Sequence, residues 1–437
     1  MSDDIDVNVE YLTRVEGHGN IEVNAKDGEI EKCEWQVIEA PRFFESLVVD
    51  RDWKELHHVT SRICGICSIG HTLASLKATE DAMDIDISEQ DKKLRKLALH
   101  AENMQSHVLH VGYLALPDLL DSKSVVPLTE THSEEVKTVI RLHKLANTMS
   151  DVVTGRTTHP QRLIPGGFTK IPNERELEEL KEKLEDSVDD LKAVADLLEN
   201  LAPKIPDFRR ETEYISLTHE DEYGLYGGDI CSSDTGTTDV DEYLDITNEY
   251  TVPQSTAKYT KNNRESYMAG ALARLNNNYQ QLSPMAKEIA GKFDLDPMEY
   301  NPYMNTIAQL VEVVHSVEDS IGIIEELLDK GLEKQGEYNS PDIEPKAGRG
   351  IGAVEVPRGI LFHDYTYDEE GKCTEANCII PTNQNHGNIQ QDMEKMVPEI
   401  IGKKPEDEIE LTLEMLVRAY DPCISCSTHY VDIDFVE

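Results

Sequence analysis

Apolar and polar positions alternate near the start of the chain, as they do in strands. Alternation over Ile21–Val23 and again over Glu34–Ile38 flanks Asp27-Gly28, a turn-forming pair, and so predicts a β-hairpin. From about residue 52, apolar residues recur instead at three- and four-residue steps, which is the spacing of helices packed against a core. The helices predicted in this way cover residues 94–116, 136–153, 174–201, 263–292, 304–331 and 406–419.

The pattern changes twice between these helices. Residues 205–260 are rich in turn formers and predict short strands or irregular structure, and residues 351–381 predict strands around a Gly371-Lys372 turn. No Pro/Ser-rich linker divides the chain. We therefore expect one α+β unit over residues 1–437, built mainly of long helices in a bundle, with β elements from the N- and C-terminal segments.

Acidic residues dominate the composition. The 437 residues include 85 Asp and Glu against 42 Lys and Arg, which gives a formal net charge of −43. Such a surface repels phosphates, which excludes nucleic acid as a main partner. It is typical of a salt-rich cytoplasm, where molar salt screens the repulsion between carboxylates, and we interpret the chain as halophilic.

The same sequence carries no sign of export or membrane insertion. No stretch approaches 18 consecutive apolar residues, so we expect no membrane span. The acidic start, Met1-Ser2-Asp3-Asp4, has neither the apolar stretch of a secretory signal nor a twin-arginine pair. A cytoplasmic protein is the expectation.

Four of the eight cysteines form two Cys-x-x-Cys pairs near opposite ends of the chain, Cys64/Cys67 and Cys423/Cys426. Each such turn can point two thiolates at one centre, and thiolates suit zinc, nickel, copper(I) or iron–sulfur clusters. Spacing alone leaves open a structural zinc site, a redox disulfide in each pair, and one metal site built from both ends of the fold. A structural zinc site usually has its pairs roughly 15–20 residues apart, far closer than these.

The residues around both pairs resemble the large subunit of [NiFe] hydrogenases. The first pair lies in Arg62-Ile63-Cys64-Gly65-Ile66-Cys67-Ser68-Ile69-Gly70-His71, and the second in Asp421-Pro422-Cys423-Ile424-Ser425-Cys426-Ser427-Thr428-His429. Further segments similar to family motifs are Arg14–Gly19, Ala40–Glu45, Val356–Gly359 and Ile379–Thr382. Within the family, the chain looks most like the alpha subunit of cytosolic NADP-linked, sulfhydrogenase-type enzymes, because of Pro41–Glu45, Tyr223–Gly227 and Arg418–Ser427.

This resemblance implies a binuclear metal centre held by all four thiolates. Cys64 and Cys423 would be terminal nickel ligands. Cys67 and Cys426 would bridge nickel to an iron that carries carbonyl and cyanide ligands. Dihydrogen would be split heterolytically there, with the proton passing to a nearby base.

Other residues of the family motifs would support that chemistry. Glu16 would be the first proton acceptor beyond the cysteines, since a carboxylate within hydrogen-bond reach of a thiolate can relay a proton. Arg358 would lie over the open coordination side, with its positive fork facing the anionic metal unit. Asp118 would pair with an arginine near the site.

The resemblance also implies an outer layer of contacts. Pro357 and Thr382 would line the cyanide pockets, and Thr382 would donate a hydrogen bond there. Arg62 and His71 would provide donors that reduce the charge on the thiolates.

A second metal site near the C-terminus is implied as well. Glu45, His429 and the backbone carbonyl of Cys378 would hold magnesium or iron. Precursors in the family lose a tail after the position of His429, so we expect a maturation endopeptidase to remove Tyr430–Glu437.

The function implied by the resemblance is reversible H2 oxidation and proton reduction by a soluble enzyme. The chain contains neither a dinucleotide-binding fingerprint nor spare cysteines for a cluster. Electrons would therefore leave through an iron–sulfur small subunit, and then through flavin and NAD(P) diaphorase subunits. Two alternatives stay open: a regulatory H2 sensor, and a quinone-binding subunit of the complex I type, although relatives of the latter type have lost the nickel cysteines.

Overall fold

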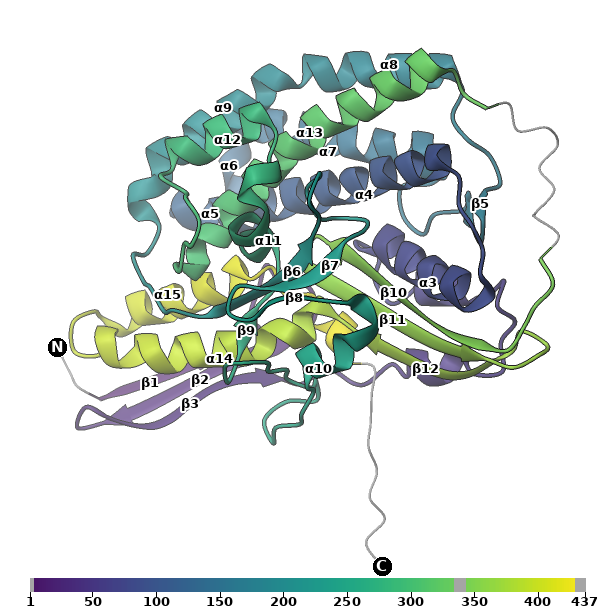
Figure 1. The fold of residues 1–437 in the computed structure, drawn as a ribbon. Coiled ribbons are helices and arrows are strands. Elements are labelled where there is room, and N and C mark those ends of the chain that lie inside the picture. Colours follow the sequence, from purple (N-terminus) through teal and green to yellow (C-terminus); the bar gives the residue numbers. More distant parts are fainter. Residues whose placement is uncertain (1–3, 334–342, 429–437) are drawn as a thin grey trace, which may run out of the picture.

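The computed structural model describes residues 4–333 and 343–428 (Figure 1). Its α-helices are α1 Phe44–Val48, α2 Leu56–Thr60, α3 Ser68–Met83, α4 Glu89–Leu109, α5 Leu116–Leu119, α6 Val125–Thr131, α7 Ser133–Thr154, α8 Glu174–Asp186, α9 Val188–Leu201, α10 Tyr243–Thr247, α11 Ala271–Asn278, α12 Pro284–Lys292, α13 Asn305–Lys330, α14 Pro381–Ile400 and α15 Glu406–Ala419. Its strands are β1 Ile5–Val9, β2 Gly19–Lys26, β3 Glu29–Val37, β4 Leu163–Ile164, β5 Gly167–Phe168, β6 Glu213–Thr218, β7 Asp229–Ser232, β8 Gly236–Thr238, β9 Tyr267–Met268, β10 Gly348–Val356, β11 Gly359–Tyr367 and β12 Cys373–Ile379.

The N-terminal strands form a three-stranded antiparallel sheet in the order β1-β2-β3. Alternate residues of β2 are buried, because one face of the sheet packs on the core and the other meets solvent. Asp27 and Gly28 both have positive φ, 50° and 78°, which is the conformation of the tight hairpin turns that match strand twist. The predicted hairpin is confirmed.

A second antiparallel sheet, β10-β11-β12, lies beneath α3. Three glycines of β10, two residues apart, face three alanines of α3 that are four residues apart. A Cβ atom added at Gly352 would lie 2.1 Å from the Ala74 carbonyl oxygen, and one at Gly348 would lie 2.6 Å from that of Ala82. The absence of side chains at these three glycines therefore lets the helix rest directly on the strand backbone.

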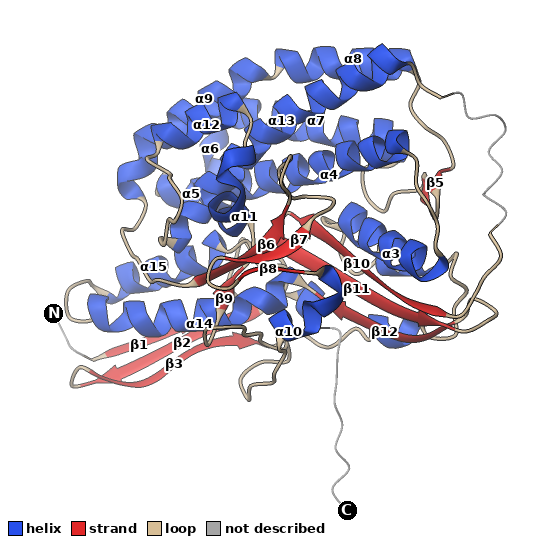
Figure 2. Ribbon diagram, viewed as in Figure 1, coloured by secondary structure: helices blue, strands red, loops and turns tan. Residues whose placement is uncertain are grey.

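The long helices form a layer over these sheets (Figures 1 and 2). α13 packs on α4, α8 and α12, and α4 also packs on α7. On the other side, α14 contacts β3 and α15 contacts β1, so these two helices lie between the N-terminal sheet and the rest of the molecule. Within the described part of the chain, no helix combines the length and apolarity needed to span a membrane. The expected α+β class, with a helix bundle and β elements from both ends, is confirmed.

Some predicted helices are interrupted. The helix expected over 174–201 is divided into α8 and α9 at Ser187, whose hydroxyl donates to the Leu184 carbonyl and competes with the helical pattern. The helix expected over 263–292 begins only at Ala271 and is divided before Pro284, which opens α12. The region 94–116 is longer than expected at its start and passes through a π-helical turn, His110–Ala115, into α5.

One long helix is absent from the sequence-based expectations. α14, Pro381–Ile400, has no simple apolar stripe, because its buried face is largely polar. Asn383, Gln384, Asn385, His386 and Asn388 are all buried, and each is hydrogen-bonded to another part of the fold.

Candidate metal centre

Two loops bring the cysteine pairs together in the interior. Cys64 and Cys67 lie in the turn between α2 and α3, and Cys67 directly precedes the first residue of α3. Cys423 and Cys426 follow α15, which ends before Pro422. All four are buried, with relative exposures of 2–4%. The second loop is held by the other end of the chain, since Glu16 and Cys423 form a parallel β-bridge.

The sulfur atoms gather around one point. The Sγ atoms of Cys64 and Cys423 are 3.6 Å apart, and those of Cys64, Cys423 and Cys426 all lie within 4.8 Å of one another. Cys64 and Cys67 are free thiols, whereas Cys423 and Cys426 are joined as a disulfide. Among the residues that the structure describes, this is the only group of three or more metal-ligating side chains at such distances.

The first cysteine pair is electrostatically asymmetric. The hydrogen bond between the two side chains lowers the pKa of Cys64, helped by the charge of Arg358 and the backbone N–H of Cys67, 3.1 Å from its sulfur. The same side-chain bond, together with burial, raises the pKa of Cys67. Cys64 is therefore the member of this pair that ionises first.

Glu16 lies against the second cysteine loop. Its Oε2 is 3.2 Å from the Cys423 sulfur and accepts the backbone N–H of Ser425 at 3.1 Å, and its Oε1 accepts the Ser425 hydroxyl. The backbone fixes this placement: the Glu16 N–H donates to the Pro422 carbonyl and the Glu16 carbonyl accepts the Ile424 N–H. Once that disulfide is reduced, a proton on Cys423 therefore has a carboxylate within direct reach.

Arg358 contacts the first cysteine pair. Its Nη1 is 3.3 Å from the Cys67 sulfur, and its Nη2 donates to Asp421 Oδ1 at 2.8 Å. The neighbouring Pro357 uses its carbonyl to accept from Arg274. Thr382 accepts the backbone N–H of Cys423 at 3.0 Å. Of the expected residues, Glu16, Arg358 and Thr382 thus contact the cysteines or their loops.

Asp118 meets two arginines, neither of which is Arg358. Its carboxylate pairs with Arg14 and accepts two bonds from Arg418, at 2.9 and 3.0 Å. Arg418 also donates to the Thr13 carbonyl at 3.0 Å. This ion cluster joins the end of α15 to the N-terminal segment just before Glu16.

The remaining expected residues differ in placement. His71 is buried and shares a hydrogen bond of 3.1 Å with His363. Arg62 is exposed, and it makes no side-chain hydrogen bond to a cysteine within the described ranges. For the second metal site, Glu45 Oε1 accepts the Cys378 backbone N–H at 2.8 Å, which places this carboxylate beside the expected carbonyl. His429 and the tail Tyr430–Glu437 lie outside the described residues.

Two side chains near the cluster, the half-buried Arg42 and the buried Glu102, had no expected role. Arg42 donates to the carbonyls of Ile63 and Ser425, at 2.7 and 3.0 Å, and so connects the two cysteine loops. Glu102 on α4 accepts the N–H groups of Ile69 and Gly70 at the start of α3, and burial raises its pKa to about 8. Glu102 interrupts the apolar face of the helix predicted over residues 94–116. A charged residue at such a position could have indicated a buried role from the sequence alone.

Comparison with known proteins explains this arrangement. A family model described as nickel-dependent hydrogenase matches residues 42–140 and 211–429, and one described as HoxL-like matches residues 6–40. The chain belongs to the nickel-dependent hydrogenase family. This hydrogenase chain is 31% identical over 430 residues to the sulfhydrogenase 2 subunit alpha of Pyrococcus furiosus, an alignment that covers 98% of the chain and all of the relative.

Other relatives agree along the whole length. The chain is 28% identical over 464 residues to the NAD-reducing hydrogenase HoxS subunit beta of Cupriavidus necator, covering 96% of the chain and 94% of the relative. Its fold matches the crystal structure of an NAD+-reducing [NiFe]-hydrogenase in the H2-reduced state with a TM-score of 0.87 and 27% identity, covering 97% and 99% of the two chains. A [NiFeSe] hydrogenase from Desulfovibrio vulgaris Hildenborough, 19% identical, shares the fold with a TM-score of 0.78.

The family expected from the cysteine motifs is thereby confirmed. The protein is the catalytic large subunit of a [NiFe] hydrogenase, and the family implies a Ni–Fe centre.

Proposed function

We propose that the chain, as a single catalytic domain, catalyses reversible oxidation of H2 to protons and electrons at a centre held by Cys64, Cys67, Cys423 and Cys426. The observation that carries this proposal is the convergence of buried sulfur atoms from opposite ends of the chain, three of them within 4.8 Å. Soft thiolate donors in a buried site fit nickel and iron, and they require the Cys423–Cys426 pair in its reduced form.

The two cysteines of each pair would have different roles in that centre. Cys64 and Cys423 would bind nickel alone, and Cys67 and Cys426 would bridge to an iron that carries carbonyl and cyanide ligands. When bound, the metal pair would polarise H2 for heterolytic cleavage.

Glu16 would take the proton released at the Cys423 sulfur. Its Oε2 is within 3.2 Å of that sulfur, and hydrogen bonds from Ser425 hold the carboxylate in place. Proton transfer to a positioned carboxylate at this distance needs no intervening water. Ser425, which donates its hydroxyl to the same carboxylate, is the neighbour through which the proton could continue.

Arg358 would place positive charge over the open side of the centre. Asp421 and the Cys67 sulfur hold its guanidinium, which is almost fully buried, and charge acts strongly in such surroundings. Pro357 and Thr382 would line the cyanide pockets, Asp118 would hold the nearby arginines, and His71 would provide a donor that reduces the charge on the thiolates. Arg62, whose side chain is exposed, would provide a further donor of this kind.

We also propose a magnesium or iron ion bound by Glu45, the Cys378 carbonyl and His429. The support is the Glu45 carboxylate, which lies on the Cys378 backbone at the end of β12. A cation there would join α1 to the C-terminal segment, from which an endopeptidase would remove Tyr430–Glu437.

Electrons would leave through partner chains. The relatives are named as subunits of a sulfhydrogenase and of an NAD-reducing hydrogenase, and both names describe chains of larger assemblies. We infer an iron–sulfur small subunit and, beyond it, flavin-containing NAD(P) diaphorase subunits in the cytoplasm. Thiolate ligands favour such a reducing compartment.

Metal analysis and infrared spectroscopy test the proposal. Cys64→Ala, Cys67→Ala, Cys423→Ala and Cys426→Ala should each lose bound nickel, the carbonyl and cyanide infrared bands and H2-dependent dye reduction. Cys231→Ala, which changes a half-buried cysteine of β7 outside the cluster, should keep all three. Full activity after loss of one cluster cysteine would refute the proposed ligand set, and intact bands with negligible turnover in the wild type would favour an H2 sensor.

A further inference from the structure

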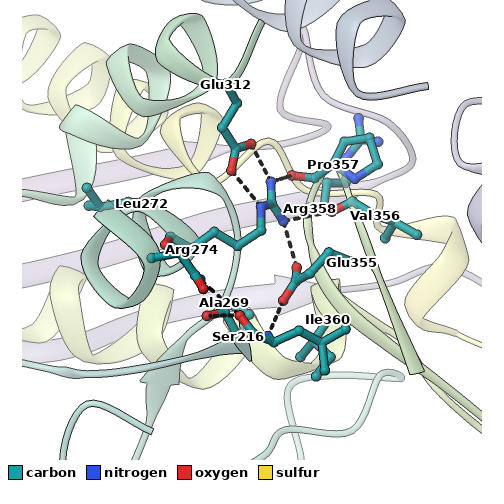
Figure 3. Close-up of polar contacts among 12 residues, drawn as sticks. Ser216, Ala269, Leu272, Arg274, Glu312, Glu355, Val356, Pro357, Arg358 and Ile360 are labelled. Atoms are coloured by element: carbon teal, nitrogen blue, oxygen red, sulfur yellow. Dashed lines mark hydrogen bonds and ion pairs between the residues drawn. The ribbon is translucent and has the colours of Figure 1, made fainter. Parts of the chain in front are cut away.

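Arg274 on α11 uses all of its hydrogen-bonding capacity inside the protein. The side chain is fully buried. Its Nε and Nη2 donate to the two oxygens of Glu312, each at 2.6 Å, and its Nη1 donates to Glu355 at 2.8 Å. The two remaining N–H groups donate to the backbone carbonyls of Val356 and Pro357, at 2.9 and 3.0 Å (Figure 3). A guanidinium has five donors, and here all five are occupied.

The two carboxylates are themselves held in place. Glu312 on α13 accepts the Tyr223 hydroxyl and lies 2.7 Å from His107 Nε2, and Glu355 accepts the Leu217 N–H at 2.7 Å. Burial opposes ionisation of Glu312, but the charge of Arg274 and the hydrogen bonds from Arg274 and His107 together outweigh it and lower the pKa of that carboxyl. The guanidinium therefore has a fixed position relative to α11, α13 and β10.

The backbone that Arg274 binds leads directly to Arg358. Val356 ends β10, and Pro357 and Arg358 form the turn into β11. Arg358 directs its guanidinium from this turn to Asp421 and the Cys67 sulfur. A shift of the Val356 and Pro357 carbonyls would move the Cα of Arg358 and, with it, the charge over the cysteine cluster.

We propose that Arg274 is a positioning residue for catalysis, which acts through the Val356–Pro357 backbone to hold the Arg358 guanidinium over the cysteine cluster. This inference rests on the proposed function of Arg358. A buried ion pair is not by itself evidence of a functional role. The role of Arg274 is inferred from its bonds to the Val356 and Pro357 carbonyls.

Arg95 provides a matched control elsewhere in the same fold. It is also fully buried, makes two bonds to one carboxylate, Glu80, at 2.6 and 2.8 Å, and donates to a backbone carbonyl, that of Ile164. It makes no hydrogen bond to the turn that carries Arg358. Arg274→Lys and Arg95→Lys each replace a buried guanidinium that binds one carboxylate with two hydrogen bonds. Only Arg274→Lys also removes the donors to the Val356 and Pro357 carbonyls.

The experiment compares these variants in the assembled holoenzyme. We expect Arg274→Lys to keep its nickel, to lose H2 turnover by roughly tenfold to a hundredfold, and to shift the carbonyl and cyanide infrared bands. Its crystal structure should show Arg358 displaced from Asp421. Arg95→Lys should change turnover by less than about twofold, with unshifted bands. Glu355→Gln, which preserves shape and the acceptor for the Leu217 N–H, should give a smaller effect of the same kind and serves if Arg274→Lys does not fold.

Three results would overturn the inference. They are turnover of Arg274→Lys within twofold of the wild type, a loss of turnover with Arg358 still on Asp421 and Cys67, and an equal loss in Arg95→Lys. A wild-type holoenzyme that binds nickel but does not turn over H2 would instead refute the proposed function. In that case the crystallographic displacement of Arg358 would still decide whether Arg274 positions it.

Discussion

Glu16 and Arg358 contact different cysteines of the cluster. The carboxylate meets the Cys423 sulfur at 3.2 Å, and the guanidinium meets the Cys67 sulfur at 3.3 Å. The Glu16 carboxylate could accept a proton from Cys423, while the positive charge of Arg358 would stabilise negative charge near Cys67. This combination suits heterolytic cleavage, which yields a proton and a negatively charged hydride. The division of labour between the two residues can be tested one at a time.

Replacing Glu16 with glutamine keeps the size and one hydrogen bond but removes the capacity to take a proton. We expect Glu16→Gln to retain nickel and to lose turnover by about 100-fold or more, as is typical when a positioned acid or base is removed. Turnover and nickel content of the same preparation give the measurement. Glu22→Gln, on the neighbouring strand and outside the cluster, should leave turnover unchanged. Near-normal turnover of Glu16→Gln would mean that another base accepts the proton.

At the scale of elements, the contact between α3 and β10 sets the spacing of the site. Cys67 immediately precedes α3, and Arg358 follows β10 by two residues. The glycines of β10 allow the two backbones to touch, so that the distance between cysteine and arginine depends on this contact. Two residues of strand advance about 6.6 Å and four residues of helix about 6 Å, which explains why the glycine and alanine spacings match.

A methyl group on β10 should disturb this contact. Gly352→Ala would place its Cβ 2.1 Å from the Ala74 carbonyl oxygen and 2.6 Å from the Ala78 backbone nitrogen. Neither backbone atom can move alone, so we expect a loss of about 1–3 kcal/mol in the free energy of unfolding. Gly322→Ala, in α13 with no atom within 4 Å of the added Cβ, should instead stabilise by about 0.5–1 kcal/mol. Chemical denaturation measures both, and equal effects would contradict the close packing.

His386 on α14 makes stability depend on pH. It lies between the Trp35 indole N–H at 3.0 Å and the Ser427 hydroxyl at 2.9 Å, and burial lowers its pKa to about 3. The unfolded chain takes up this proton near pH 6.5 and the folded chain only near pH 3, so the contribution is complete above pH 6.5 and is lost as pH falls towards 3. The slope from this group is at most about 1.4 kcal/mol per pH unit.

Thermal or chemical unfolding between pH 7 and pH 4 tests this dependence. His386→Gln cannot titrate, so its stability should fall less steeply with acid than that of the wild type. Burial also lowers the pKa of His315, to about 4. The unfolded variant still takes up a proton at His315, so some loss of stability with acid should remain in His386→Gln. Parallel curves for wild type and His386→Gln would show that His386 does not carry the effect.

Elements and site residues that depend on local patterns or motifs could be predicted from the sequence, whereas those that depend on tertiary contacts could not. The N-terminal hairpin and α13 follow from local patterns, and the cysteine loops follow from motifs that need no knowledge of the fold. α14 was missed because its buried positions are polar and are satisfied only by tertiary hydrogen bonds, such as that from Gln384 to the Ile360 carbonyl. The roles of Arg42 and Arg274 likewise depend on backbone carbonyls that approach from distant segments.

At the scale of the whole molecule, uncompensated charge is the main feature. If every Lys and Arg were paired, 85 − 42 = 43 carboxylates would still lack a cation. Ions screen such repulsion over about 30 Å at 0.01 M salt and about 3 Å at 1 M. We therefore expect the free energy of unfolding to rise as KCl increases over this range, and the assembly with partner subunits to persist only at the higher concentrations.

Denaturant unfolding and the mass of the complex, measured across a KCl dilution series, give the test. A rise in stability with salt would show that acidic repulsion outweighs the surface ion pairs, which salt weakens. An intact, active complex in millimolar buffer would contradict the interpretation of the chain as halophilic.

The bridge between Glu16 and Cys423 also has a consequence for biosynthesis. A ribosome makes Glu16 about 400 residues before the second cysteine pair, so the site cannot close until that pair has emerged. Until then, the Glu16 backbone lacks the partners that Pro422 and Ile424 provide, and two of the four thiols do not yet exist. The proposed four-cysteine site can therefore form only after Cys426 has been made, and a product truncated before Cys423 would lack half of its thiols.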